Sequence, residues 1–457
     1  MRKIIHIILI TFISQLMSEA YLSGIFRDNM ILQREKDIEI WGYGDPGDEV
    51  IVRISDQEIE NIVNDDGKWM ITFKPLKMSK EPIHFEFESE GYVVNLEDVL
   101  VGDVWFCSGQ SNMVLSTSFA NNAVEEIKIS ENPNIRLFTV THSYELELNH
   151  EPYITDTWEY CTPDNISKFS ATAYFFGREL NNELDIPIGL INSSYGSSMI
   201  EAWTSINSNQ EIDPELEQRH YPSAIFNTMV YPFIDFSIKG FIWYQGERNT
   251  RTDDACFKYR YQLPVLIKDW RTHWNDNELP FYYVQLPNFK IDYNWALIRE
   301  SMEVAESTEH TGMAITIDIG KSDNIHPPNK QEVGRRLSLL ALKNTYEKDI
   351  IDSGPKYKSY KINNEQITLD FVNIQDGLKY IGDEITGFEI ASDDRIFYTA
   401  EATINGNSII ISSKYTDNPV AVRYGWSSNP KCNIYNSADL PLQPFRTDSW
   451  PLNYNGF

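Results

Sequence analysis

The stretch VGDVWFCSGQSNM, residues 101–113, decides the fold of this chain. Its apolar run is typical of a strand that is buried in a parallel sheet. The run stops at a small polar cluster, in which Gly109 permits a backbone conformation that larger residues avoid. Because ligands of open α/β sheets bind where such strands end, the stretch predicts a buried strand and a sharp turn that presents Ser111 at the ligand-binding edge of a sheet.

The polar cluster around Ser111 fits two interpretations. Serine and asparagine after a strand most often mark a turn or the N-cap of a helix. In the catalytic interpretation Ser111 is a nucleophile, and Gln110 and Asn112 present their side chains to the same concave spot. Gln110 and Asn112 are therefore candidates to contact or support a substrate.

The region around this stretch, residues 98–348, alternates apolar strands with helical patterns. Such alternation predicts a largely parallel sheet with helices on both faces, in which turn residues after the strands meet at one edge. We expect strands at residues 135–140, 186–192, 241–244, 281–285 and 313–319, and helices at residues 171–184 and 257–274.

The regions on either side read as β structure. Residues 21–97 contain short alternating segments joined by tight turns, which predicts an all-β, sandwich-like N-terminal domain. Alternation of period two returns in residues 349–457, which predicts a C-terminal β region. The expected fold class is therefore α/β, a parallel sheet with helices on both faces, flanked by β structure at both ends.

Composition limits the classes of function. The chain has 457 residues, enough for about three domains. Its hydrophobic content of 42% argues against disorder, and its mean hydropathy of −0.39 argues against an integral membrane protein. A formal net charge of −28 makes nucleic acid or an anionic membrane surface an improbable partner.

The first 20 residues have the features of a signal peptide. Two basic residues precede an apolar run at residues 4–13, and small residues occupy positions Ser18 and Ala20. The run is short for a membrane span. We expect cleavage before Tyr21, export to the periplasm or the extracellular space, and no membrane insertion after cleavage.

A second polar cluster follows the apolar strand in KGFIWYQGERN, residues 239–249. Gln245 carries an amide that could donate a hydrogen bond to the negative oxygen of a tetrahedral intermediate. Glu247 is a candidate to support the substrate or the site. Both side chains could instead simply brace the end of the strand.

A third cluster contains His326, in a loop between the expected strand at residues 313–319 and a helix capped by Asn329. An isolated histidine in a loop usually has no catalytic role. Here the Pro327-Pro328 pair restrains the backbone, and a serine nucleophile needs a base. His326 is the best candidate for that base.

The blocks SGQSNM, WYQGE and DNIHP resemble those of SGNH hydrolases, specifically the sialate O-acetylesterase family. The resemblance extends over nearly the whole chain after the expected signal peptide, from FRDNMILQREKDIEIWGYGDPGDEV to AVRYGW and PFRTDSW. It implies an SGNH hydrolase domain with attached β structure, and a serine esterase that removes acetyl groups from sugar hydroxyls.

The resemblance also implies roles for individual residues. Ser111 would form an acyl-enzyme with His326 as its base. The backbone amides of Ser111 and Gly196 and the side-chain amide of Gln245 would bind the oxyanion. The block around Gly196 reads YGSS where the family commonly reads WGGT, so one glycine and the tryptophan are missing.

The acid that orients His326 has two possible assignments. Asp323 stands three residues before the histidine, the D-x-x-H spacing of SGNH hydrolases, whereas many sialate O-acetylesterases read NDIHP. We expect Asp323 to complete a triad; a Ser-His dyad is the alternative. This chemistry requires no metal and no organic cofactor.

The expected substrate is O-acetylated sialic acid or another acetylated glycan. The alternative enzyme is an acetylxylan esterase or another polysaccharide deacetylase. A non-catalytic carbohydrate-binding protein is the alternative of another class, against which the intact candidate residues argue. The oligomeric state and the disulfide status of the four cysteines stay open.

Overall fold

The computed structural model describes residues 19–152, 157–214, 216 and 221–451, so residues 1–18 of the expected signal peptide lie outside it. Strand β10 (Val99–Gly109) is the central strand, and all 11 of its residues are buried. It is parallel to β13 (Ile188–Ser194) on one side and to β14 (Gly240–Tyr244) on the other. The strand predicted from the apolar run is confirmed.

The sheet around β10 has the strand order β12-β11-β13-β10-β14-β15-β16. Every neighbouring pair is parallel except β11 and β12. In a parallel sheet all the carboxyl ends lie at one edge, so the loops that follow β10, β13 and β14 converge there. The bounds of the other four strands are β11 (Asn132–Thr139), β12 (Glu159–Cys161), β15 (Phe281–Val284) and β16 (Thr311–Ala314).

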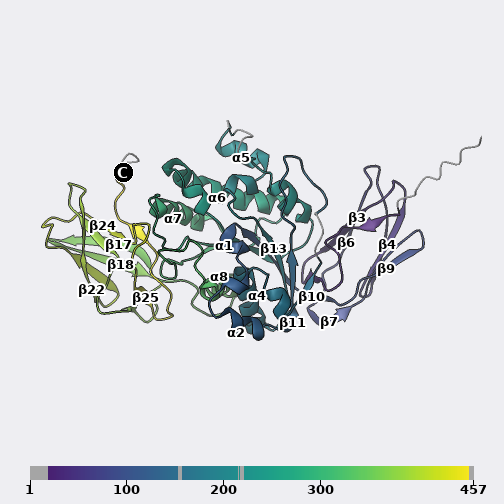
Figure 1. Cartoon of the computed structure of the whole chain (residues 1–457), viewed down its shortest axis with the longest axis horizontal. Helices are drawn as coiled ribbons and strands as arrows, with labels where there is room; N and C mark the ends of the chain where they lie inside the picture. Colours follow the sequence, from purple (N-terminus) through teal and green to yellow (C-terminus); the bar gives the residue numbers. More distant parts are fainter. Residues whose placement is uncertain (1–18, 153–156, 215, 217–220, 452–457) are drawn as a thin grey trace, which may run out of the picture.

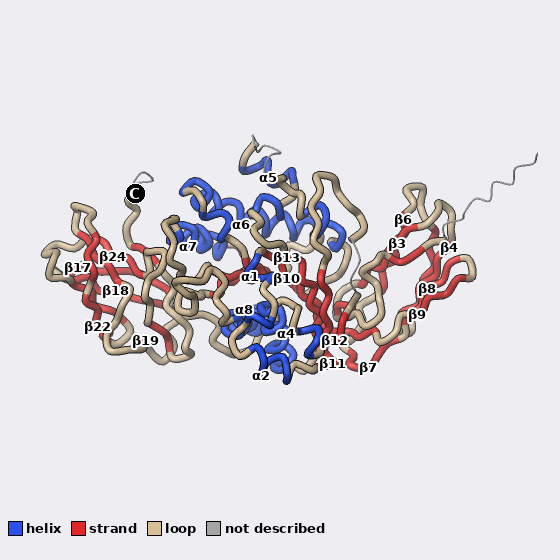
Figure 2. The backbone as a smooth tube through the Cα atoms, viewed as in Figure 1, coloured by secondary structure: helices blue, strands red, loops and turns tan. Residues whose placement is uncertain are grey.

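Helices cover both faces of this sheet, which confirms the predicted α/β class (Figures 1 and 2). On one face lie α5 (Ile206–Ile212), α6 (Asp253–His273) and α7 (Trp295–Glu303). On the other lie α2 (Ala123–Lys128), α4 (Ala171–Leu184) and α8 (Lys330–Asn344). Helix α4 matches the predicted helix at residues 171–184. The shorter helices are α1 (Ser111–Val114), α3 (Pro163–Ile166), η1 (Thr117–Phe119), η2 (Ile200–Trp203), η4 (Phe226–Val230), η5 (Tyr231–Phe233), η6 (Glu247–Thr250) and η7 (Val304–Ser307).

Two small antiparallel sheets form most of the N-terminal β structure, at the right of Figure 1. Strand β4 alternates buried and more exposed residues, as expected for a sheet with one face in a core. The first sheet contains β1 (Tyr21–Leu22), β3 (Ile38–Tyr43) and β6 (Lys68–Phe73); the second contains β5 (Gln57–Ile62), β4 (Glu49–Ile54), β8 (Phe85–Ser89) and β9 (Tyr92–Asn95).

Strand β10 also joins the N-terminal β structure to the parallel sheet. Before it enters that sheet, its first residues pair with β2 (Ile31–Gln33) and β7 (Ser79–Ile83). The buried carboxylate of Asp103 then accepts hydrogen bonds from Arg34 and from the Tyr346 hydroxyl. The apolar residues of both regions form one continuous core.

The C-terminal β region lies at the opposite end of the molecule and has a core of its own (Figure 1). An ion pair between Arg446 and Glu300 of α7 and hydrogen bonds from Arg299 to the carbonyls of Ser427 and Ser428 attach it to the helices. Its strands are β17 (Lys356–Asn363), β18 (Gln366–Val372), β19 (Leu378–Tyr380), β20 (Phe388–Ala391), β21 (Phe397–Thr399), β22 (Glu401–Asn405), β23 (Ser408–Ser412), β24 (Ala421–Tyr424), β25 (Ile434–Asn436) and β26 (Phe445–Arg446).

Two further observations concern the described residues. The four cysteines are all free thiols. Within the described ranges, no helix combines the length and the apolar character needed to cross a bilayer.

Candidate active site

The nucleophile candidate stands two residues after the end of β10. Ser111 is the first residue of α1 and is partly exposed. Gly109 has a φ of +139°, and a Cβ at this position would overlap the carbonyl oxygen of Tyr244. The backbone N–H of Gln110 donates to the same carbonyl at 2.9 Å. The sharp turn therefore requires glycine and is fixed against the end of β14.

The candidate base meets the candidate nucleophile. The His326 Nε2 atom lies 2.9 Å from the Ser111 Oγ atom, although the two residues are 215 positions apart in the chain. Burial lowers the pKa of His326, and the positive charge of Lys330 lowers this pKa further. The imidazole therefore stays neutral to lower pH than an exposed histidine, and the neutral form is the one that can accept a proton.

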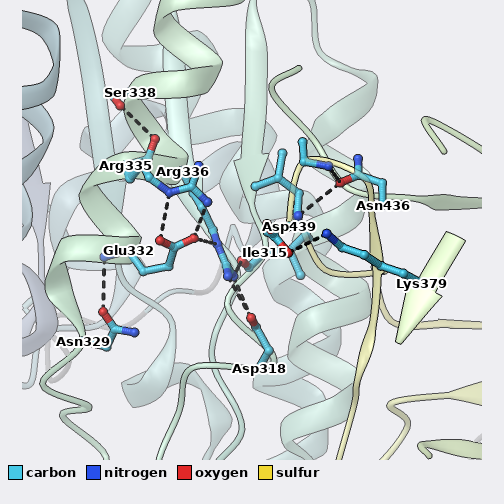
Figure 3. Close-up of polar contacts among 12 residues, drawn as sticks. Ile315, Asp318, Asn329, Glu332, Arg335, Arg336, Ser338, Lys379, Asn436 and Asp439 are labelled. Carbon is cyan, nitrogen blue, oxygen red and sulfur yellow. Dashed lines mark hydrogen bonds and ion pairs between the residues drawn. The ribbon is translucent and has the colours of Figure 1, made fainter. Parts of the chain in front are cut away.

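The loop that carries His326 is anchored on both sides. Before His326, the Arg336 guanidinium of α8 forms a two-pronged ion pair with Asp318, at 2.6 and 2.8 Å (Figure 3). After it, the side chain of Asn329 caps α8 by accepting the Glu332 N–H, as predicted. Two anchors on one helix therefore fix both ends of the loop that carries His326.

Asp323 does not take the place expected of a triad acid. Residues 321–324 form a tight turn, closed by the Asn324 N–H donating to the Lys321 carbonyl at 3.3 Å. Asp323 is exposed at the tip of this turn, and no hydrogen bond or ion pair between the described residues joins it to His326. The neighbouring Asn324 faces the histidine instead, because its Oδ1 accepts the His326 backbone N–H at 2.9 Å.

The geometry also differs from expectation at Gln245, whose side chain is completely buried. Its amide nitrogen donates to the Gln110 Oε1 atom at 3.1 Å, the Ser198 carbonyl at 3.1 Å and the Asn249 Oδ1 atom at 2.8 Å. Its oxygen accepts the Tyr259 hydroxyl at 2.9 Å. Two N–H groups already face three protein acceptors, so this amide is not presented to a substrate oxygen.

Gln110 is the amide that Gln245 positions beside Ser111. The Gln110 Oε1 atom accepts hydrogen bonds from Gln245 and from the Arg248 backbone N–H, the latter at 3.2 Å. These two hydrogen bonds fix the orientation of the Gln110 amide, so its nitrogen remains available to donate a hydrogen bond to another group. In the described part of the chain that nitrogen has no hydrogen-bond acceptor.

Gly196 lies in the turn that follows β13, at the same edge of the sheet. The N–H of Tyr195 donates to the Gly109 carbonyl at 2.9 Å, which fixes this turn beside the nucleophile. A Cβ added at Gly196 would meet no described atom within 4 Å, so the glycine borders open space. The turn after β13 therefore lies beside the nucleophile turn and leaves open space at Gly196.

Asn112 links the turn of Ser111 to the loop of His326. Its amide nitrogen donates to the Ile325 carbonyl at 3.0 Å and to the Glu247 Oε1 atom at 2.5 Å. Its oxygen accepts the ammonium of Lys330 at 2.6 Å. The expected support role of Asn112 and Glu247 has a structural counterpart here, because one side chain joins the residue after Ser111 to the residue before His326.

Lys330 is the member of this cluster that the sequence analysis missed. Burial lowers its pKa from 10.5 to about 7, and burial also raises the pKa of Glu247. A signal was available in the sequence: Lys330 shares one face of α8 with Val333, Leu337 and Ala341, which are all buried. A lysine on the apolar face of a helix indicates a specific buried partner.

No metal-binding cluster stands out in this part of the molecule. Among residues that the structure describes, no group of three or more histidine, cysteine, aspartate or glutamate side chains could hold a metal ion.

Comparisons with known proteins identify the family of this chain. Residues 101–343 match the family described as carbohydrate esterase, sialic acid-specific acetylesterase. The sialate O-acetylesterase of Mus musculus is 29% identical, over 91% of this chain and 92% of its own length. The human sialate O-acetylesterase is 28% identical, over 93% of this chain and 91% of its own length.

A solved structure gives the same result in three dimensions. The crystal structure of a novel carbohydrate acetylesterase from Xanthomonas citri superposes with a TM-score of 0.89 at 35% identity, covering 94% of this chain and all of that one. The fold and these matches define a carboxylic ester hydrolase that acts on carbohydrates. The chain belongs to the family of sialic acid-specific acetylesterases.

Proposed function

We propose that this carbohydrate acetylesterase removes O-acetyl groups from sialic acid, with Ser111 as the nucleophile and His326 as the general base. The observation that carries the proposal is the 2.9 Å distance between the His326 Nε2 atom and the Ser111 Oγ atom. A serine hydroxyl needs a base within hydrogen-bond distance to attack an ester at neutral pH.

The proposed reaction has two steps. In the first, the Ser111 oxygen attacks the acetyl carbonyl carbon while its proton moves to the His326 Nε2 atom; the sugar hydroxyl then leaves with that proton. In the second, water gives a proton to His326 while its oxygen attacks the acyl carbon; the bond from that carbon to Ser111 then breaks, acetate leaves, and the Ser111 oxygen takes the proton back from His326. The backbone amides of Ser111 and Gly196 would bind the oxyanion, with the Gln110 amide in the place first expected for Gln245.

The test combines a substitution with covalent labelling. Ser111→Ala should abolish release of acetate from a chromogenic acetate ester without altering the circular dichroism spectrum. A fluorophosphonate should label the wild-type protein at Ser111 and fail to label the variant, as shown by peptide mass spectrometry. Hydrolysis by the alanine variant at a rate near that of the wild type would refute the assignment of the nucleophile.

The substrate needs a separate measurement. Acetate release from O-acetylated sialic acid should exceed release from acetylated xylan. The opposite order would favour the polysaccharide deacetylase, and no hydrolysis of any acetate ester would favour a carbohydrate-binding protein.

We propose in addition that the chain is exported after cleavage before Tyr21. Support comes from the basic residues, the apolar run and the small residues at positions 18 and 20. N-terminal sequencing of the protein recovered from its native compartment should begin at Tyr21.

A further inference from the structure

A hollow of about 340 Å³ opens beside the nucleophile turn. Its volume falls in the range of about 300–1,000 Å³ that is typical of small-molecule sites. Tyr144, Tyr195, Tyr221 and Arg248 are among the residues that line it.

Two walls of the hollow are attached to the residues directly before Ser111. The N–H of Tyr195 donates to the Gly109 carbonyl at 2.9 Å. The N–H of Arg248 donates to the Gln110 Oε1 atom at 3.2 Å. The hollow therefore adjoins the turn that carries Ser111, and a sugar bound in it would lie on the side of that turn where Tyr195 and Arg248 stand.

One wall consists of tyrosines. The ring of Tyr144 meets that of Tyr195 edge to face at 6.1 Å and that of Tyr221 at 5.9 Å. Tyr144 and Tyr221 are 53% and 54% exposed, so their rings are available to a ligand. Such rings offer an apolar face to the C–H groups of a sugar and hydroxyls to its polar groups.

Arg248 places a positive charge in the hollow. Its side chain is half-buried, and within the described ranges no hydrogen bond or ion pair engages its guanidinium. The chain carries 67 acidic against 39 basic residues, and other arginines, such as Arg336 and Arg446, are paired with carboxylates. An unpaired guanidinium in a hollow of so acidic a protein is a ready site for an anion, and its planar fork fits a carboxylate.

We propose that this hollow is the sugar subsite and that Arg248 binds the carboxylate of an acidic O-acetylated sugar. The inference rests on the proposed function, because it places the sugar relative to Ser111. It makes Arg248 a residue that selects acidic over neutral sugars.

The experiment compares kcat/KM for O-acetylated sialic acid, for its carboxyl methyl ester and for an O-acetylated neutral hexose. The wild type should prefer the free acid. Arg248→Gln should lower kcat/KM for the free acid by roughly 10- to 100-fold, as expected when a charge-assisted hydrogen bond is lost, and should abolish the preference over the methyl ester. Arg248→Lys should retain part of the preference for the free acid over the methyl ester.

Arg251→Gln is the matched control, because Arg251 is exposed, follows closely in the chain and does not line the hollow. This variant should keep the wild-type preference. An O-acetylated uronic acid, compared with O-acetylated sialic acid, identifies which acidic sugar the site takes.

The possible failures are distinguishable. If the wild type hydrolyses acetate esters but treats the free acid and the methyl ester alike, or if Arg248→Gln keeps the wild-type ratio, the carboxylate role is refuted and the esterase proposal stands. If no acetate ester is hydrolysed, the proposed function itself fails. Thermal unfolding of each variant checks that a lost preference does not reflect a lost fold.

Discussion

The side chain of Asn112 lies between two buried groups of opposite charge, the carboxylate of Glu247 and the ammonium of Lys330. The ammonium can only donate, so it selects the oxygen end of the amide and turns the nitrogen end towards the Ile325 carbonyl. Lys330 therefore orients a side chain that ties the nucleophile turn to the loop of the base. It is a positioning residue in the proposed mechanism.

A pH profile tests this role together with that of His326. Because burial and the Lys330 charge lower the pKa of His326, the neutral base persists as the pH falls, and the acid limb of wild-type kcat/KM should have its midpoint below about 6.5. Lys330→Met removes the neighbouring charge, so the midpoint should move up. It should also lower kcat at least about tenfold, since a misplacement of about 1 Å can cost about 100-fold.

The control is Lys343→Met, a partly exposed lysine in the last turn of the same helix. This variant should show the wild-type profile. If the acid limbs of Lys330→Met and the wild type had the same midpoint, the Lys330 charge would have no effect on the pKa of His326.

Asp323 allows a second prediction at this scale. Its carboxylate is exposed at the tip of a turn and is not hydrogen-bonded to His326, and a solvated carboxylate orients an imidazole far less than a buried one. Asp323→Asn should therefore lower kcat less than about tenfold, whereas His326→Ala should lower it at least about a thousandfold. A loss of similar size in both variants would restore the triad that the D-x-x-H spacing suggested.

At the scale of elements, hydrophobic periodicity was a good guide where burial and hydrogen-bonded pairing coincide. It located β10, β14 and the helix at residues 171–184, which are extensively buried and regularly hydrogen-bonded over their length. The turn at Gly109 was also predictable, because glycine alone takes its φ without strain.

Periodicity failed at residues 315–319, where a continued strand was expected. Strand β16 ends at Ala314, although Ile315, Thr316 and Ile317 are buried. Their polar groups are satisfied elsewhere: the Ile315 carbonyl accepts from Arg336, and the Thr316 hydroxyl donates to the Gln285 carbonyl. An apolar pattern indicates that residues are buried, but it does not indicate whether a neighbouring strand supplies hydrogen-bond partners for their backbone.

The candidate site was also predictable only in part. Motif blocks identified Ser111 and His326, which the structure brings to 2.9 Å. The Gln245 amide cannot donate to a substrate because its N–H groups already donate to oxygens of Asn249, Ser198 and Gln110, whose positions the sequence does not show. The exposure of Asp323 depends on the direction of a turn. Neither can be read from residue types, because each is decided by neighbours that only the folded chain assembles.

At the scale of the molecule, the N-terminal β structure and the parallel sheet share one core, and the C-terminal region has another. Ile54 and Ile411 are both fully buried, one in each core. Truncation of a buried isoleucine to alanine usually costs about 2–5 kcal/mol of stability. The two substitutions should therefore destabilise different parts of the molecule.

Calorimetry combined with residual activity measures this difference. Ile54→Ala should lower the temperature at which esterase activity is lost, because its core continues into the catalytic sheet. Ile411→Ala should shift a transition that is separate from the loss of activity. Equal shifts of the activity loss by both variants would show that the two cores unfold as one unit.

Strand β10 pairs with the N-terminal strands through its first residues and with β13 and β14 through its last, and Ser111 stands two residues after its end. Successive residues of a strand point to opposite faces, so one inserted or deleted residue would turn every later side chain to the wrong face. It would also displace the serine by about 3.3 Å from its base. The chain can therefore exchange one apolar residue of β10 for another far more readily than it can change the number of residues there, and we expect changes of length to be accepted only in the loops.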